Sequence, residues 1–404
     1  MKAKRLFLLW VALALLLFYN IWLVYTGRTW VYRALVYNFV DIDDHELFVQ
    51  RPVPAGTPMH WPLSINYNKF VPDSTARKEL DTMRSVAYLV IHRDSILYEK
   101  YWEGYNDSSW SNSFSMSKSV VGVLTGIALR QGLIRSLDQR VEEFLPEYEN
   151  DSKGRLTVRQ LLTMSAALSW DEAYASLFSV TTEAYYGRDL QGLMDRLEVI
   201  SEPGRDFNYQ GGATQLLAMV IMRASGKNLS TYCSENLWKP LGAEHDAGWS
   251  LDKKDGMEKA SCCIYSNARD FARIGSLYLH LGHANGRQLL DTSFVRESVT
   301  PAPLLKDGKT NSEYGFQWWL TTTDGLDVFY CRGILGQYIA VIPSMELVMV
   351  RLGHERHKAE DGTLLDLPVY LKAATDMVRK NKQAADDQLP AVGMSKVLRI
   401  TGRQ

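Results

Sequence analysis

The residues with the clearest chemical potential are Ser115 and Lys118, in the stretch Ser-Met-Ser-Lys at residues 115–118. Because residues three apart lie on one face of a helix, Lys118 can reach the hydroxyl of Ser115. A serine hydroxyl becomes an effective nucleophile when a base removes its proton. A lysine can be that base when burial or nearby charge disfavours its charged form. The spacing therefore predicts a lysine-activated serine nucleophile.

The residues after Lys118 indicate the helix that would hold this pair. Apolar residues recur at helical spacing at Val120, Leu124, Ile127 and Ala128, and Gly132 is the predicted C-cap. The N-terminus of such a helix supplies amide donors for a developing oxyanion. A second Ser-x-x-Lys, Ser250 to Lys253, lies in the polar stretch 250–259 with no apolar helix behind it. We interpret that stretch as a solvated loop.

Length and composition limit the classes of function. The 404 residues can bury one large core or two subdomains. With 45 Lys and Arg against 46 Asp and Glu, the net charge is −1, so the chain lacks the excess of positive charge that is typical of nucleic-acid-binding proteins. The four cysteines are too scattered for a disulfide framework, and adjacent Cys262 and Cys263 would pair only under strain. We interpret all four cysteines as small buried apolar residues.

The N-terminus differs from the rest of the chain. Lys2, Lys4 and Arg5 precede residues 6–25, which are apolar apart from Asn20 and long enough to span a bilayer as a helix. The basic flank predicts a cytoplasmic N-terminus and export of the remainder. The alternative is a cleaved signal peptide and a secreted protein. We favour an uncleaved anchor, because no small-x-small cleavage site follows the apolar run.

The pattern of predicted elements indicates an α+β fold. Residues 86–92 and 96–101 form a predicted hairpin, and residues 337–342 and 346–352 form two further strands. Residues 133–240 are mostly helical, and further helices are expected at 268–281 and 365–380. The expected architecture is an antiparallel sheet flanked by helices, plus an inserted all-helical lobe. The catalytic cleft would lie between the two.

Four segments follow from these patterns. They are a membrane anchor at 1–26, an irregular proline-rich connector at 27–75, a catalytic domain at 76–380 and a polar tail at 381–404. A leaving group must also receive a proton, so a second acid–base group is needed. Two tyrosines compete for that role: Tyr209, which follows Pro203-Gly204, and Tyr265, in Tyr265-Ser266-Asn267.

Several ordered blocks make the chain resemble the serine β-lactamase and penicillin-binding-protein family. The resemblance is strongest to the branch that contains class C β-lactamases and 6-aminohexanoate-dimer hydrolase, and it covers about residues 80 to 380. The blocks are 114–119, 136–138, 145–147, 161–165, 203–217, 268–273, 314–319 and 332–338. It implies a β-lactamase/DD-peptidase-like fold, with Ser115 as the nucleophile and Lys118 as its partner.

The resemblance also ranks the remaining site residues. Tyr209 is favoured over Tyr265, because Pro-Gly precedes it and Leu-Leu follows it as in relatives. Carried over by position, the backbone amides of Ser115 and Ile334 form the oxyanion hole. Arg332 and Gly333 fall in the third motif, as candidate substrate contacts. Independently of the resemblance, Tyr185 and Tyr186 are candidates for the edge of the substrate cleft.

Two departures from the family pattern affect the expected substrate. Gly211 stands where many relatives carry Asn, and Cys331-Arg332-Gly333 stands where β-lactamases carry Lys-Thr-Gly. In relatives, both lost groups help hold the β-lactam amide and carboxylate. Efficient β-lactam hydrolysis is therefore not expected, whereas cleavage of other amides or esters is less affected.

These observations predict a serine hydrolase anchored in the bacterial inner membrane, with its catalytic domain in the periplasm. Its partners would be a small-molecule or peptide amide or ester and, through the N-terminal helix, the lipid bilayer. No cofactor, metal or nucleic acid is implied. Two alternatives stay open: a non-catalytic penicillin-binding or peptidoglycan-sensing module on the same fold, and a true class C-type β-lactamase.

Overall fold

The computed structural model describes residues 2–360 and 362–388, and its centre is one antiparallel sheet. The strand order is β11 (Trp319–Thr323), β12 (Leu326–Gly333), β13 (Gln337–Ile342), β14 (Leu347–Gly353), β2 (Ser85–His92) and β3 (Ser95–Tyr101). β2 and β14 are buried along their whole lengths, which explains their near-continuous apolar sequences. The predicted hairpin and the two later strands are confirmed.

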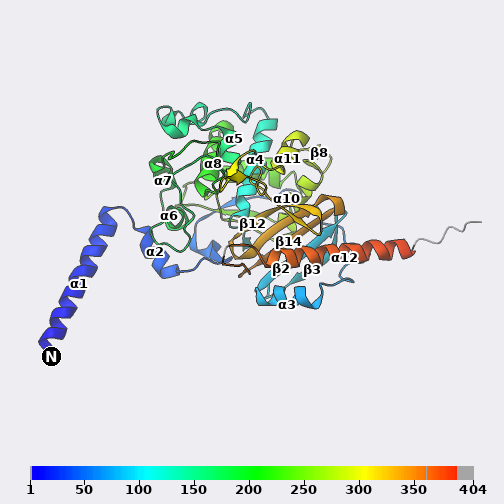
Figure 1. The fold of residues 1–404 in the computed structure, drawn as a ribbon, viewed down its shortest axis with the longest axis horizontal. Helices are drawn as coiled ribbons and strands as arrows, with labels where there is room; N and C mark the ends of the chain where they lie inside the picture. Colours follow the sequence, from blue (N-terminus) through cyan, green and yellow to red (C-terminus); the bar gives the residue numbers. More distant parts are fainter. Residues whose placement is uncertain (1, 361, 389–404) are drawn as a thin grey trace, which may run out of the picture.

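Helices cover both faces of this sheet (Figure 1). On one face, α10 (Ala268–Leu279) packs against β13 and β14, and a side chain at Gly275 would meet Val348. On the other face, α12 (Asp366–Gln388) places the ring of Tyr370 5.5 Å from the guanidinium of Arg351. Because residues 348 and 351 of one strand point to opposite faces, the two helices sandwich the sheet. α3 (Ser74–Thr82) packs beside α12.

A helical lobe is inserted between β3 and the later strands, as predicted. Its main helices, α4 (Met116–Arg130) and α8 (Gly211–Ser225), pack against each other. α8 ends at Gly226, whose φ of 66° is a left-handed cap that glycine adopts without strain. The shorter helices of the lobe are α5 (Val158–Leu162), α6 (Val180–Tyr186), α7 (Leu190–Arg196) and α9 (Leu229–Cys233).

A second sheet, which the sequence patterns did not reveal, connects the lobe to the N-terminal segment. Its strand order is β1 (Gln50–Val53), β5 (Ala247–Ser250), β6 (Ile264–Ser266) and β4 (Ser111–Asn112). The remaining short elements are η1 (Asp44–Leu47), η2 (Val141–Glu143), η3 (Pro146–Tyr148), η4 (Ser152–Arg155), η5 (Ser234–Trp238), β7 (His283–Ala284), β8 (Arg287–Gln288), α11 (Thr292–Ser298), β9 (Leu305–Lys306), β10 (Lys309–Thr310), η6 (Ile334–Gly336) and η7 (Pro343–Met345).

The N-terminal segment begins with α1 (Lys2–Tyr25), an apolar helix that extends away from the rest of the molecule (Figure 1). Within the described residues, it is the one helix long and apolar enough to cross a membrane. The segment expected to be irregular also contains a helix, α2 (Trp30–Tyr37), which packs against α6, and the strand β1. Prolines at 52, 54, 58 and 62 suggested irregular chain, but β1 is an edge strand, where proline is tolerated.

Two other expectations need correction. The polar residues from Asn381 to Gln388 continue α12, and the rest of the predicted tail lies outside the described residues. The stretch 250–259 is a solvated turn only at residues 253–255: Ser250, Asp252, Glu258 and Lys259 at its two ends are buried. Pairing of β5 with β1 and β6 draws this polar segment inward, where Glu258 meets Arg51 in an ion pair at 2.7 Å. Counting polar residues within the stretch cannot predict this ion pair, because Arg51 is distant in sequence.

Candidate active site

α4 places Ser115 and Lys118 together at its first turn. Ser115 is the N-cap residue, and Lys118 Nζ donates a hydrogen bond to Ser115 Oγ at 3.2 Å. The same amine donates to the carbonyl oxygen of Ser261 at 2.8 Å. Lys118 is 3% exposed and has no carboxylate partner among the described residues. An amine held in this way lies ready to exchange a proton with the serine hydroxyl.

The backbone leading into Ser115 is held in an unusual conformation. Phe114 has a φ of 43°, a left-handed value that costs a residue with a bulky side chain free energy. Its amide donates to Asn112 Oδ1 at 2.9 Å, and Asn112 in turn donates to the hydroxyl of Tyr265 at 2.9 Å. These bonds tie the turn before Ser115 to strand β6, which pairs with β4. Positive φ at such a site is commonly part of a functional geometry.

The two candidate tyrosines lie in different environments. Tyr209 is half-buried in the loop before α8, and Lys118 Nζ lies 5.0 Å from the centre of its ring. That ring packs against Tyr314 and Trp319. Tyr265 is fully buried in β6, its hydroxyl accepts the Asn112 amide, and it does not line the cavity beside Ser115. Of the two, Tyr209 is the one in contact with Lys118.

The third-motif segment also lies near Ser115. β12 ends at Gly333, where a Cβ would come within 2.3 Å of the Ser113 carbonyl oxygen, so only glycine fits this close approach. Ile334 follows and lines the same cavity as Ser115. The guanidinium of Arg332 lies over the Trp319 ring at 3.6 Å, in the neighbouring hollow that Tyr209 also lines. The strand thus brings Ile334 to the nucleophile and Arg332 to the Tyr209 side.

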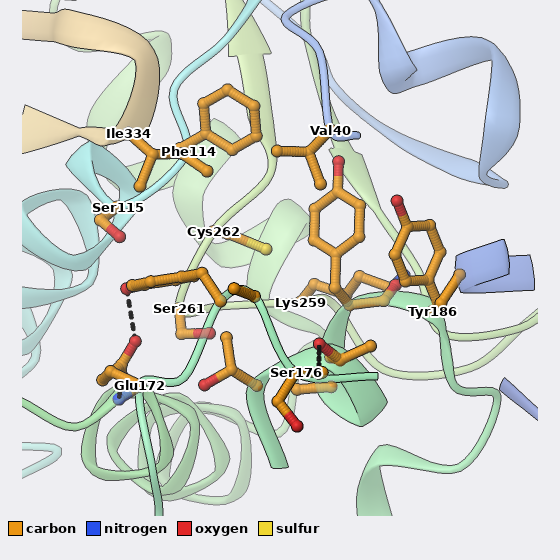
Figure 2. A pocket seen from close by; sticks show the side chains of 18 of the residues that line it. Val40, Phe114, Ser115, Glu172, Ser176, Tyr186, Lys259, Ser261, Cys262 and Ile334 are labelled. Carbon is orange, nitrogen blue, oxygen red and sulfur yellow. Dashed lines mark hydrogen bonds between the residues drawn. The ribbon is translucent and has the colours of Figure 1, made fainter. Parts of the chain in front are cut away.

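A cavity of about 380 Å³ extends from Ser115 toward α2 and α6. Figure 2 shows Ser115 and Ile334 on one side and Tyr186 on the opposite side, with Cys262 between them. Tyr185 and Tyr186 both line it, but at the end remote from the serine, and the Tyr185 hydroxyl donates to Asp44 at 2.5 Å. The volume is in the range of pockets that hold small organic molecules.

Glu172 is a cavity residue that the sequence patterns did not indicate. Its carboxylate accepts from the indole of Trp170 at 2.9 Å, the hydroxyl of Tyr174 and the backbone amide of Gly211. A Cβ at Gly211 would lie 2.9 Å from the Trp170 ring and 3.2 Å from Glu172. The asparagine of many relatives therefore has no room here, because Trp170 and Glu172 occupy its place. No motif marks these residues; only the fold brings them to Gly211.

The cysteines are a further correction. Cys262 and Cys263 form a disulfide, and Cys263 has a φ of 74°, whereas Cys233 and Cys331 are free and buried as expected. The disulfide directly follows Ser261, whose carbonyl binds Lys118, and Cys262 lines the cavity. An adjacent pair had suggested two separate thiols, because the required turn is unfavourable in an unconstrained chain. Here the surrounding strands hold that turn.

Residues 73–373 match the beta-lactamase family model, which is well over half of the chain. A 6-aminohexanoate-dimer hydrolase from Paenarthrobacter ureafaciens is 27% identical over 312 residues, covering 71% of this chain and 79% of that protein. A solved structure from Bacillus anthracis, named for the same hydrolase, has a TM-score of 0.73 at 22% identity. It covers 85% of this chain and 93% of that chain.

A D-stereospecific amidohydrolase from Streptomyces shares the fold, with a TM-score of 0.57 at 17% identity over 75% of this chain and 98% of that chain. This chain belongs to the beta-lactamase family. It is a serine hydrolase of that family, whose relatives cleave amides and esters. The resemblance inferred from the motif blocks is thereby confirmed.

Proposed function

We propose that this chain is a membrane-anchored serine hydrolase that cleaves an amide or ester through an acyl-enzyme on Ser115. The observation that carries the proposal is the hydrogen bond from the buried Lys118 amine to Ser115 Oγ at the start of α4. The proposal of an amide or ester as substrate is supported by two relatives, the 6-aminohexanoate-dimer hydrolase and the amidohydrolase. The domain at 76–380 carries the chemistry, and no metal or organic cofactor takes part.

The reaction proceeds in two halves. In its neutral form Lys118 takes the proton of Ser115 as Oγ attacks the carbonyl carbon, and the amides of Ser115 and Ile334 stabilise the oxyanion. Tyr209 and Lys118 then pass a proton to the leaving amine or alcohol, which departs and leaves the acyl group on Ser115. Water, deprotonated by the same pair, then attacks the acyl carbon. The bond from that carbon to Ser115 Oγ breaks, Oγ takes a proton back from the pair, and the acyl group leaves as a carboxylic acid.

A turnover measurement separates this function from its alternatives. Full-length protein mixed with p-nitrophenyl acetate should release nitrophenolate in a burst followed by a steady rate. A burst without further release would instead indicate a penicillin-binding module that is acylated but not regenerated. Faster hydrolysis of a β-lactam than of the ester would indicate a class C-type β-lactamase. We expect weak β-lactam hydrolysis, since Trp170 and Glu172 fill the site of the missing asparagine side chain.

We further propose that residues 1–26 stay attached as a single-pass anchor, with the catalytic domain in the periplasm. The last turns of α1 pack on the domain: Leu23 is fully buried with Trp30 and Val31, and the Tyr32 hydroxyl donates to Asn20 at 2.8 Å. Removal of α1 near Tyr25 would expose that cluster, which favours retention.

Intact-mass measurement of protein extracted from membranes should therefore find residues 1 to 25 present. The apolar side chains of α1, such as Phe7 and Phe18, are largely exposed and need a lipid environment. A soluble protein whose N-terminus lies near residue 26 would contradict the anchor and favour a cleaved signal sequence.

A further inference from the structure

The segment that follows α1 forms part of the wall of the catalytic cavity. Ala34 of α2 and Asn38, Phe39 and Val40 after it line the same cavity as Ser115. Figure 2 shows Val40 beside the cavity residues. Leu177 and α6, which pack against this segment, continue the wall, and the Leu177 carbonyl accepts the indole N–H of Trp30 at 3.1 Å. The cavity thus lies directly between the nucleophile and the membrane-proximal end of the molecule.

The outer surface of the same segment is apolar and uncovered. The exposed fractions are 56% for Leu35, 75% for Val36 and 82% for Phe39, whereas Trp30, Val31 and Ala34 on the other face of α2 are buried. We call Leu35, Val36, Tyr37 and Phe39 the α2 apolar face. Contiguous exposed apolar residues of this kind indicate a partner surface.

The position of α1 identifies that partner as the lipid bilayer. α2 follows α1 after only four residues, and the Arg28 guanidinium lies 5.0 Å from the Trp22 ring and 5.9 Å from the Phe178 ring. Phe178 is 46% exposed beside this junction. A bilayer that holds α1 therefore meets the α2 apolar face at its surface, and apolar helix faces with flanking cations are typical of that interface.

The cavity interior suits an apolar chain better than a charged one. Its lining includes Ala34, Val40, Leu177, Ala184, Tyr186 and Leu190. The amine of Lys259, although in this wall, donates to the Tyr185 carbonyl and lies 3.5 Å from the centre of the Phe48 ring. Burial holds the pKa of Lys259 well below its usual range, which disfavours a charged amine at this end of the cavity.

From these features we propose that the substrates are amphiphiles with an apolar acyl chain, which enter from the bilayer past the α2 apolar face and lodge the chain in the cavity that residues of α2 and α6 line. The scissile carbonyl then lies at Ser115, and the polar leaving group faces the Tyr209 side. This inference rests on the proposed hydrolase function and specifies its substrate class. A small charged amide, by contrast, would gain little from this cavity.

The first test compares acyl chain lengths on the full chain reconstituted in phosphatidylcholine vesicles. We expect kcat/KM for p-nitrophenyl octanoate to exceed that for the acetate at least about tenfold, because each buried methylene favours binding. Ala184→Phe, which places a ring in the cavity where α6 lines it, should lower that ratio. Ala175→Phe should lower the same ratio without disturbing buried packing, because Ala175 is exposed on the loop at the cavity rim.

The second test addresses entry from the bilayer. Leu35→Gln with Val36→Gln should lower the ratio of the rate on vesicle-embedded p-nitrophenyl palmitate to that on dissolved acetate about fivefold or more. Ile65→Gln is the matched control, because Ile65 is 81% exposed and lies outside the α2 apolar face and the cavity. An unchanged ratio in the double variant would overturn entry by this route.

The two proposals fail in different ways. If acetate is hydrolysed in a Ser115-dependent manner but octanoate is no faster, the acyl-chain inference is wrong and the hydrolase function stands. If neither ester is hydrolysed and Ser115 is not acylated, the proposed function itself is wrong. Preference for short charged amides over octanoate would also overturn the inference.

Discussion

Ser115→Ala should abolish covalent labelling by a fluorophosphonate probe and lower ester hydrolysis by roughly 10⁴-fold or more, as removal of a nucleophile does in other serine hydrolases. The substitution removes Oγ, the atom that forms the acyl bond. Its side chain makes no capping hydrogen bond to α4, so alanine should leave the helix intact. Labelling is read by intact mass, and the folded state by thermal unfolding.

Ser250→Ala is the matched control for this experiment, because Ser250 begins the other Ser-x-x-Lys stretch. Ser250 is fully buried in β5, and its hydroxyl accepts from Gln50 Nε2 at 2.8 Å. Its loss should lower the free energy of unfolding by about 1 kcal/mol while leaving labelling unchanged. Probe attached to Ser115→Ala protein would show that another residue is the nucleophile.

Tyr209→Phe should lower kcat by about 10²–10⁴-fold, the usual contribution of a positioned acid–base group. The ring stays packed on Tyr314 and Trp319, so the free energy of unfolding should change little. Lys118 would keep its bond to Ser115 Oγ, and probe labelling should slow without disappearing. Steady-state rates and thermal unfolding of the variant together test these expectations.

Tyr265→Phe should give the opposite pattern. Removal of its hydroxyl leaves the buried Asn112 amide without an acceptor, which costs roughly 1–3 kcal/mol of stability, while kcat changes little. If Tyr265→Phe is instead the variant that loses kcat, the tyrosine assignment is wrong. Asn267 would then be the next residue to test as a substrate ligand, although its side chain caps α10 and donates to Asp270 at 2.8 Å.

Local patterns predicted the parts of the molecule that depend on neighbouring residues. The Ser-x-x-Lys spacing is a property of one helical turn, and the hairpin at 85–101 follows from two β-rich runs joined by a short turn. The cap of α5 is equally local: Thr157 accepts a hydrogen bond from the Gln160 amide, three residues on, at 3.2 Å. Each of these signals lies within a few residues of the feature it predicts.

The features that were missed depend on contacts distant in sequence. Lys259 is buried because Phe48 and the Tyr185 carbonyl receive its amine, and Glu172 reaches the active site because it bonds Gly211. α2 is short and needs α6 to cover its inner face. Polar residues are predicted to be exposed when their partners are unknown, and this explains why the buried ends of the stretch 250–259 were missed.

The order of strands in the main sheet has a consequence for how the chain is made. β2 pairs with β14, so residues 347–353 must be synthesised before the free edge of β2 can form its hydrogen bonds. The half of the oxyanion hole proposed for Ile334 is also synthesised long after the Ser115 helix. A chain that stops before β14 therefore leaves the edge of β2 unpaired and prone to aggregation, and a chain that stops before Ile334 also lacks that half of the proposed oxyanion hole. Premature termination would thus yield an aggregating, inactive fragment.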